Sequence, residues 1–503
     1  MRRRLRLRSD SLVPRFAHGV LATLLVAVTA SSAGAGVEIG LNFTGYAPEP
    51  GSFGALYPPP DTMGAVGEQH IVEFLNHAYS VYRKSDGQLL QRVDELTNGS
   101  SGLTKFWEAA GVTPTGGVFD PRVLYDAASQ RWFAVSLDYG TEVPFPPGAY
   151  GPNNYLVAVS KSADPTEGWT GFKIASDPTG TTWADFPQMG MDAEALYLGG
   201  LRITLGGGNA GQNLLVLPKA DLLAAIPSVA NATNLSNLTL NQTGINPQPV
   251  VNLDGGGLPA TLLSGVYASL GALVSTEIGG SIESPVLARS KFIAVPATEG
   301  GTVPYSAAQP GPKTNINAGP GRFSAYAMQV NGSIWAAEST RVDGRLAVRW
   351  YEIDAATDTL SQSGDVTQPT LDLYYPSIAV NPYGQVVIGM SGSSETDFVG
   401  AYAAVGETVG GVTSFGAPLL LQAGLANFER VEPEAGRNTW GDYSATVVDP
   451  SDPHRFWTFQ EYVEAEDIYA VRITELILTP EPGKDLLGMS SFLGLAALRR
   501  RRE

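Results

Sequence analysis

Short segments in which apolar and small residues alternate recur along most of the chain, from residue 36 to residue 478. Gly, Pro, Asp and Asn separate these segments, and these residues favour turns. Alternation with a period of two is typical of β-strands that have one buried and one exposed face. The pattern therefore predicts an all-β body with many tight turns.

A longer unit of this pattern repeats along the body. Each copy starts with an Asp or an aromatic residue, often followed by Pro, and continues as an apolar strand, a turn and a second strand. The recognisable copies start at Asp61, Asp120, Asp185, Tyr375 and Asp442. The starts are roughly 60 to 67 residues apart, except for one interval about three times as long. This long interval predicts two further copies in which the pattern is degenerate.

Each copy supplies more than two strands. After Asp120, alternation resumes at residues 155–160 and again at residues 169–174. Four antiparallel strands per repeat are typical of a propeller blade, and closing the blades into a ring protects most sheet edges. We expect a single β-propeller of four-stranded antiparallel sheets over residues 36–478, with seven blades and six as the alternative.

Three local features refine this expectation. The strand at residues 38–44 is expected to complete the last blade beside residues 468–478. Residues 244–321 are rich in Gly and small residues, which indicates an elaborated blade with long loops. Residues 222–230 are expected to form one or two helical turns, and Gly206 to Asn209 a hairpin turn.

The N-terminus has the three parts of a secretory signal peptide. Five Arg residues within the first eight positions precede an apolar run at residues 20–30, and Ala33-Gly34-Ala35 follows. A positive segment, a short apolar segment and an A-x-A site predict a signal peptide at residues 1–35, cleaved after Ala35. The protein is therefore expected to cross the inner membrane.

The C-terminus carries a second set of ordered features. Pro480-Glu481-Pro482 precedes a weakly apolar segment at residues 486–498, and the cluster Arg499, Arg500, Arg501 and Arg502 follows. Residues 479–503 resemble the PEP-CTERM sorting signal of Gram-negative bacteria. The resemblance implies an exosortase as a partner, transient membrane contact through the tail, and a location in the cell envelope or outside the cell.

The charge and the residue types exclude several function classes. The net charge is −17, and ten of the 32 basic residues lie in the two terminal segments, so the body is more acidic than the whole chain. Such a body repels nucleic acid and anionic lipid. The chain has no Cys, which excludes disulfides, zinc-thiolate sites and a Cys nucleophile.

The acidic residues that start the repeats are the main candidates for ligand binding. Equivalent positions of a propeller surround its axis, so Asp61, Asp120, Asp185 and Asp442 are expected to converge at one mouth of the channel. Such a ring would suit Ca²⁺ or a hydroxyl-rich sugar. The alternative is that each carboxylate accepts backbone N–H groups and fixes its own turn. No catalytic or metal-ligating residue is assigned, and no cofactor other than Ca²⁺ is expected.

The segment from Ala158-Val159-Ser160 through Asp164-Pro165 to Gly168-Trp169 resembles secreted propellers of the sialidase-like superfamily. Their aspartate box, Ser-x-Asp-x-Gly-x-x-Trp, is absent. The resemblance would imply several Arg side chains that converge on a carboxylate substrate, and Arg122, Arg202 and Arg289 are the candidates.

Three functions remain open. The leading expectation is a non-enzymatic envelope or matrix protein that binds polysaccharide or surface proteins. The alternatives are a glycan-active hydrolase or lyase and a structural module of the extracellular matrix. Convergent carboxylates in an open site would favour the enzyme, and an exposed aromatic surface would favour the binding protein.

Overall fold

The computed structural model describes residues 36–52, 55, 59–94, 101–140, 151–265, 268–299, 305–431 and 436–479. The predicted signal peptide and the sorting signal from Pro480 onward lie outside these residues. The processing and sorting candidates Ala33, Ala35, Pro480, Glu481, Pro482 and Arg499 to Arg502 therefore stay predictions.

Seven sheets of four or five strands make up most of the described part, and we name them blades 1 to 7 in chain order. The strands run from the innermost to the outermost position in nearly every blade, joined by antiparallel hairpins. Blade 1 is β2 (Met63–Val66), β3 (His70–Phe74), β4 (Tyr79–Arg83) and β5 (Leu89–Val93). Blade 2 is β6 (Val118–Asp126), β7 (Arg131–Asp138), β8 (Asn154–Ser160) and β9 (Trp169–Ala175). Blade 3 is β10 (Thr182–Met191), β11 (Ala195–Thr204), β12 (Asn209–Pro218) and β13 (Thr233–Leu238).

The remaining blades carry more irregular strands. Blade 4 is β14 (Gln248–Pro249), β16 (Ala260–Ser264), β17 (Ala272–Ser281) and β18 (Ser284–Ala294). Blade 5 is β21 (Met328–Val330), β22 (Ser333–Val342), β23 (Arg345–Asp354) and β24 (Thr359–Val366), with β15 (Val251–Asn252) parallel to β21. Blade 6 is β25 (Asp372–Val380), β26 (Gln385–Ser393), β27 (Gly400–Val409), β28 (Val412–Phe415) and β29 (Leu419–Gln422). Blade 7 is β31 (Ala445–Val448), β32 (Arg455–Ala465), β33 (Ile468–Thr479) and β1 (Gly36–Thr44).

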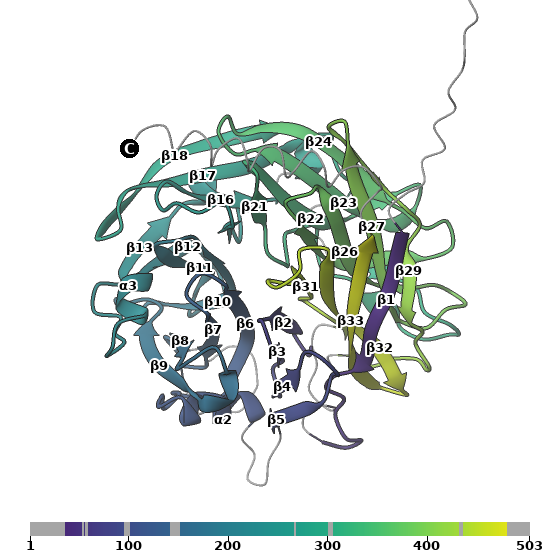
Figure 1. Ribbon diagram of the computed structural model, residues 1–503, viewed down its shortest axis with the longest axis horizontal. Helices are drawn as coiled ribbons and strands as arrows, with labels where there is room; N and C mark the ends of the chain where they lie inside the picture. Colours follow the sequence, from purple (N-terminus) through teal and green to yellow (C-terminus); the bar gives the residue numbers. More distant parts are fainter. Residues whose placement is uncertain are drawn as a thin grey trace, which may run out of the picture. The chain divides into compact units, whose positions relative to one another are not determined.

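The innermost strands of neighbouring blades contact one another around the ring (Figure 1). Strand β2 contacts both β6 and β31, which joins blade 1 to blades 2 and 7. Strand β15 directly follows β14 and pairs with β21, so it links blades 4 and 5. The described residues thus form a seven-bladed propeller, and the predicted fold class is confirmed.

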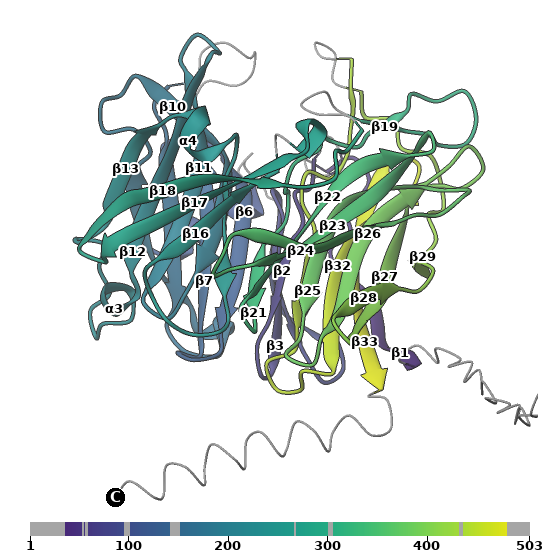
Figure 2. The same ribbon diagram turned by 90° about the horizontal axis from the view of Figure 1, so that it is seen from above.

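The ring is closed by strands from both ends of the body. Strand β1 pairs antiparallel with β33, from Gly36 opposite Thr479 to Thr44 opposite Arg472. The predicted role of residues 38–44 is therefore confirmed. Figure 2 shows β1 and β33 side by side at the edge of the same sheet.

Burial differs between inner and outer strands. All nine residues of β25 are buried, and so are those of β26, because adjacent blades cover both faces of an inner strand. Most residues of the outer strand β18 are exposed instead. Burial therefore falls from the inner to the outer strands, and the alternation at residues 155–160 lies in β8, a strand that is buried on both faces.

A residue with a positive backbone φ precedes or interrupts the innermost strand in six of the seven blades of the described part. These residues are Asp61, Asp120, Phe186, Asn246, Tyr375 and Asp442. The predicted repeat start at Asp185 is therefore wrong by one residue, because Phe186 occupies the equivalent position. The β-bulge between Asp185 and Gln188 has counterparts between Phe119 and Arg122 in β6 and between Tyr374 and Ser377 in β25, so Asp185 is equivalent to Phe119 and Tyr374. Asn246 starts one of the two degenerate copies, and blade 5 is the other.

The helical segments are short and lie in connections between strands. They are α2 (Gly102–Ala109), α3 (Lys219–Leu222), α4 (Leu240–Thr243), η1 (Pro165–Glu167) and η2 (Ala268–Leu270). The helical turn predicted over residues 222–230 instead ends at Leu222, whereas residues 206–208 form the expected turn between β11 and β12. No helix in the described ranges is long and apolar enough to cross a membrane.

Candidate functional site

Five acidic side chains converge where the innermost strands of several blades begin. We call Asp61, Asp120, Asp185, Asp442 and Glu461 the axial cluster. Asp61 and Asp442 precede β2 and β31, Asp120 and Asp185 lie in β6 and β10, and Glu461 lies in β32. The negative charges of Asp120, Asp442 and Glu461 act on Asp61, and those of Asp120 and Asp442 act on Asp185. The structure therefore brings the four predicted Asp residues together, while their ligand-binding role stays a prediction.

Hydrogen bonds hold the inner members of the cluster. The amide of Asn76 donates to Asp61 Oδ2 at 2.5 Å, and Asn76 Oδ1 accepts the backbone N–H of Asp120 at 2.7 Å. The hydroxyl of Tyr443 donates to Asp120 Oδ2 at 2.9 Å. The backbone N–H of Thr62 donates to Glu461 Oε1 at 3.3 Å. Residues of blades 1 and 7 thus fix three of the five carboxyl groups.

A buried arginine lies beside these carboxyl groups. Arg122 is 0% exposed, and its guanidinium group donates to Pro187 O, Ser324 O and Gln188 Oε1 at 2.8, 2.9 and 3.0 Å. Its Cζ atom lies 3.7 Å from the centroid of the Tyr443 ring. Arg122 therefore connects blade 2 to blade 3, to the segment ahead of blade 5 and to blade 7.

A second arginine covers the outer part of the cluster. The Cζ atom of Arg322 stacks 3.4 Å from the centroid of the Phe186 ring. Arg322 Nη2 lies 3.9 Å from Asp442 Oδ1, at the limit of an ion pair. The positive charge of Arg322 also acts on Asp185. Arg322 thus partly balances the charge of the outer carboxyl groups, but at a longer distance than a direct hydrogen bond.

Burial raises the pKa values of the clustered carboxyl groups. It raises the pKa of Asp185 to about 7 and that of Glu461 to about 8, and in both the negative charge of Asp442 acts in the same direction. The pKa of Asp61 lies well above its usual range, because of burial first and then because of the charges of Asp120 and Asp442. Several of these groups therefore carry a proton at neutral pH.

The cluster has an inner and an outer layer. Asp61 and Glu461 are 1% and 2% exposed, whereas the Asp442 and Arg322 side chains are 33% and 22% exposed. Asp185 is also only partly buried. Asp185, Asp442 and Arg322 are therefore the groups that a ligand would reach first.

The aromatic side chains around the cluster are buried. Phe186, Tyr375 and Tyr443 are all at most 5% exposed. Tyr375 fits between two glycines, because a Cβ atom at Gly441 would lie 2.5 Å from a ring carbon, and one at Gly319 would lie 2.9 Å away. Both glycines have positive φ values, which suit a residue without a side chain. The site therefore offers converging carboxyl groups and does not expose these three rings.

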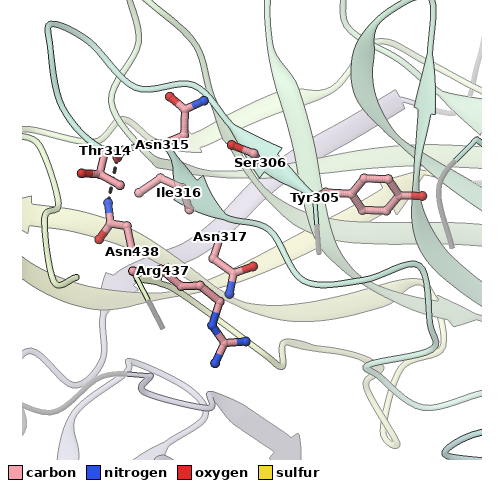
Figure 3. A pocket seen from close by; sticks show the side chains of 9 residues that line it. Tyr305, Ser306, Thr314, Asn315, Ile316, Asn317, Arg437 and Asn438 are labelled. Atoms are coloured by element: carbon pink, nitrogen blue, oxygen red, sulfur yellow. Dashed lines mark hydrogen bonds between the residues drawn. The ribbon is translucent and has the colours of Figure 1, made fainter. Parts of the chain in front are cut away.

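A polar hollow of about 230 Å³ adjoins the cluster through Tyr375. Its walls come from β19 (Ser306–Ala307), β20 (Ile316–Asn317) and β30 (Asn438–Thr439) and the loops beside them. The amide of Asn438 donates to Thr314 O at 3.0 Å, as Figure 3 shows together with Asn317 and Arg437. The hydroxyl of Tyr375 lies 3.3 Å from both Asn317 O and Asp442 Oδ1, which joins the hollow to the cluster.

The three arginines suggested for a sialidase-like site do not converge. Only Arg122 lies in the cluster. Arg202 lies in β11, where it pairs with Asp177 at 3.1 Å, and Arg289 lies in the outermost strand β18, where it pairs with Glu277 and Asp358. Arg122 lies in an innermost strand, Arg202 in the second strand of its blade and Arg289 in an outermost strand. The three side chains therefore lie at different distances from the propeller axis and do not meet around one ligand. That expectation is wrong.

Sequence reasoning missed Glu461, Arg322 and Tyr443 as members of the site. Glu461 had a signal, because it interrupts the apolar residues Trp457, Phe459 and Val463 at alternate positions of one strand. Arg322 lies in an irregular connection, where no periodicity marks it. For the described part of the chain, no group of three or more His, Asp or Glu side chains is arranged to hold a metal ion. The geometry thus gives no support to the predicted Ca²⁺ site.

Comparisons with family models and with curated proteins give no match. Among solved structures, a Trypanosoma rangeli sialidase in complex with sialic acid is 12% identical, with a TM-score of 0.34, and the match covers 74% of this chain and 55% of that one. An α-L-arabinofuranosidase from Fusarium graminearum is 10% identical, with a TM-score of 0.36 and coverages of 87% and 97%. Drosophila Semaphorin 1b, extracellular domains 1-2, is 8% identical, with a TM-score of 0.32 and coverages of 88% and 87%. Similarities of this size do not distinguish an enzyme from a binding protein.

Proposed function

We propose that this chain is an exported protein of the cell envelope or extracellular matrix whose propeller binds a glycan at the axial cluster. The observation that carries the glycan site is the convergence of five acidic side chains, two of which are partly exposed, beside a polar hollow, and the same convergence supports the glycan-cleaving candidate described below. Carboxyl groups accept hydrogen bonds from sugar hydroxyls, and a small number of convergent polar groups is typical of ligand sites.

Export and sorting rest on the sequence. The signal peptide at residues 1–35 and the resemblance to a PEP-CTERM signal at residues 479–503 support passage through the inner membrane and processing by an exosortase. Proteins sorted in this way are expected in bacteria that make extracellular polysaccharide, which provides a glycan partner at the same location.

Glycan binding is tested by screening the purified protein against an array of oligosaccharides, followed by thermal unfolding with each hit. A saturating ligand is expected to raise the unfolding midpoint by about 2–5 °C. Asp442→Asn should abolish the rise, and the matched variant Glu283→Gln, which removes one exposed charge from blade 4, should retain it. Absence of any hit would contradict the proposal and would leave a surface-protein partner or a structural matrix role.

A second candidate function is cleavage of the bound glycan by a hydrolase or lyase reaction. The partly exposed Asp185 favours it, because its pKa of about 7 lets a carboxyl group act as a general acid at neutral pH. Product analysis of each array hit tests this function. Asp185→Asn should lower the release of new chain ends by roughly 100-fold or more while glycan binding persists. Binding without any product would exclude the enzyme.

A further inference from the structure

A small sheet outside the seven blades forms walls of the polar hollow beside Tyr375. Strand β19 pairs antiparallel with β20, and β20 pairs parallel with β30, which the chain reaches only after blades 5 and 6. The seven blades close into a ring without these three strands. Additions of this kind on a rigid scaffold often carry binding residues. The small sheet is therefore a candidate for ligand contacts.

The two faces of the small sheet differ in burial. Side chains alternate between the faces of a strand, and residues directly opposite each other share a face. Ile316 and its partner Asn438 are buried, at 0% and 1% exposure. Asn317 and its partner Ser306 lie on the other face, together with Asn315 two positions earlier, and all three are at least partly exposed. These three side chains are among those that line the hollow (Figure 3).

Buried amide side chains hold the small sheet in place. Gln309 is 4% exposed, and its amide donates to Thr314 O and Phe428 O at 2.6 and 2.8 Å. Its oxygen accepts the backbone N–H of Phe428 at 3.0 Å. Asn438 donates to Phe428 O at 2.7 Å and accepts the backbone N–H of Arg430 at 2.8 Å. The hollow therefore has its shape before a ligand binds, which lowers the entropic cost of binding.

Three side chains of the hollow keep unused hydrogen-bonding groups. Within the described part of the chain, the Ser306 hydroxyl and the Asn315 amide have no hydrogen-bond partner. Asn317 uses its oxygen, which accepts the backbone N–H of Gly319 at 3.2 Å, whereas its NH₂ group has no partner there. A hydroxyl and a primary amide can each donate and accept hydrogen bonds. These groups therefore suit a ligand that does both, as sugar hydroxyls do.

The charge of the surroundings restricts the ligand further. None of the described residues that line the hollow is acidic, so a cationic ligand would find no counter-charge there. An anionic ligand would meet the long-range repulsion of a chain with a net charge of −17. Arg437 is the charged residue of the lining, and it is already engaged in another interaction. An uncharged, hydroxyl-rich ligand fits these conditions best.

We infer that the hollow binds one uncharged sugar unit through Ser306, Asn315 and Asn317. This inference rests on the proposed glycan binding and deepens it, because it names a second point of contact and the class of sugar. The volume of about 230 Å³ lies below the roughly 300–1,000 Å³ of typical sites for drug-sized ligands, so the hollow suits a single unit. The Tyr375 hydroxyl joins Asn317 O to Asp442 Oδ1, so the next unit of the glycan would lie at the axial cluster.

Calorimetric titration of the purified full chain with oligosaccharides of different charge tests the ligand class. The uncharged probes are cellotetraose, maltotetraose, mannotetraose and xylotetraose, the anionic probe is tetragalacturonate, and the cationic probe is fully de-N-acetylated chitotetraose. The best uncharged probe is expected to bind about tenfold or more tightly than either charged probe. A charged probe that binds as tightly as the best uncharged one would overturn the uncharged ligand and leave glycan binding in place.

Variants of the hollow test the site. Asn317→Asp keeps the oxygen that accepts the N–H of Gly319 but removes the amide donor, and Asn315→Ala removes a side chain that has no hydrogen-bond partner among the described residues. Each should weaken the binding of the best uncharged probe about tenfold. Asn241→Ala, at an exposed position of α4, should change it less than twofold. The unfolding midpoint of each variant shows whether it is folded.

The outcomes separate this inference from the proposed function. If Asn315→Ala and Asn317→Asp leave binding unchanged while Asp442→Asn abolishes it, the sugar unit in the hollow is overturned and glycan binding at the axial cluster stands. Weaker binding in both hollow variants supports the inference, whatever the effect of Asp442→Asn. If no array glycan and no probe binds, the proposed function fails and the inference fails with it.

Discussion

The Asp residues that start the repeats have a conformational role and an electrostatic one. Asp61, Asp120 and Asp442 adopt positive φ values, a region that Asp and Asn tolerate better than most residues. The alternative that the carboxylates only fix their own turns is not what Asp61 and Asp120 show, because the side chains of Asn76 and Tyr443 donate hydrogen bonds to them. Backbone geometry thus selects the residue type, and the ring brings the charges together.

Arg122 is expected to be the most sensitive single residue of the channel. Arg122→Met would leave Pro187 O, Ser324 O and Gln188 Oε1 without their donor, at about 1–3 kcal/mol for each buried acceptor. The free energy of unfolding should therefore fall by roughly 3 kcal/mol or more, measured by chemical denaturation. Arg83→Met, at a side chain that is 45% exposed, should change it by less than about 0.5 kcal/mol. A similar small change for Arg122→Met would contradict its role as a link between blades.

Glu461 should make the protein less stable as the pH rises. Its pKa is about 8 in the folded state against an ordinary value of 4.5, so the folded chain keeps a proton that the unfolded chain releases between these values. Its stabilising contribution is complete at low pH and is lost as the pH rises through 8. The free energy of unfolding should fall by roughly 2 kcal/mol or more between pH 5 and pH 9.

Denaturant titrations of a variant isolate this contribution. Glu461→Gln cannot titrate, so its stability should depend less steeply on pH than that of the unchanged protein. Glu283→Gln, at a fully exposed position, should keep the original dependence. Identical pH profiles for Glu461→Gln and the unchanged protein would show that Glu461 is not protonated in the folded state.

At the scale of elements, the pairing of β1 with β33 decides whether the ring is closed. Asn42 in β1 accepts hydrogen bonds from Arg472 and Thr474 of β33 at 2.6 and 2.8 Å. Its amide donates to Leu421 O of β29 at 3.2 Å. One side chain thus joins the N-terminal strand to both the last blade and the blade before it.

Asn42→Ala is expected to weaken this closure. The loss of its three contacts should lower the free energy of unfolding by about 1–2 kcal/mol, measured by thermal or chemical denaturation. Asn209→Ala, in the exposed hairpin between β11 and β12, should change it by less than about 0.5 kcal/mol. Equal effects of the two variants would mean that the contacts of Asn42 add nothing beyond the backbone pairing of β1.

At the scale of the whole molecule, both ends of the propeller body meet in one blade. Gly36 lies opposite Thr479, so the residue after the predicted cleavage site pairs with the residue before Pro480. Removal of the predicted signal peptide and of a sorting signal that starts at Pro480 would leave every described strand intact. Processing and folding are therefore compatible.

Intact-mass measurement of the protein from a host that processes it tests this compatibility. The mature chain is expected to begin at Gly36, so that β1 stays complete. A mature N-terminus beyond Thr44 would remove β1 and contradict the closure of blade 7 by this strand, because β33 would then have an open edge.

The sequence by itself determined the fold class, the closure of the ring and the position of three of the four Asp residues in the repeat. These features depend on local patterns, namely alternation along strands and turn residues at regular intervals. The fourth Asp was misplaced by one residue, because the positive-φ position of the β-bulges in these innermost strands is the residue before Pro, which is Phe186 in blade 3, as it is Asp120 in blade 2 and Tyr375 in blade 6.

Only the tertiary structure decided how the site is composed. Glu461 comes from a second strand and Arg322 from an irregular connection, and neither shares a local pattern with the Asp residues. Their convergence depends on the closing of the ring, which brings together residues hundreds of positions apart. The raised pKa values follow from the same cause, because only a packed environment removes water from charged groups and places like charges side by side.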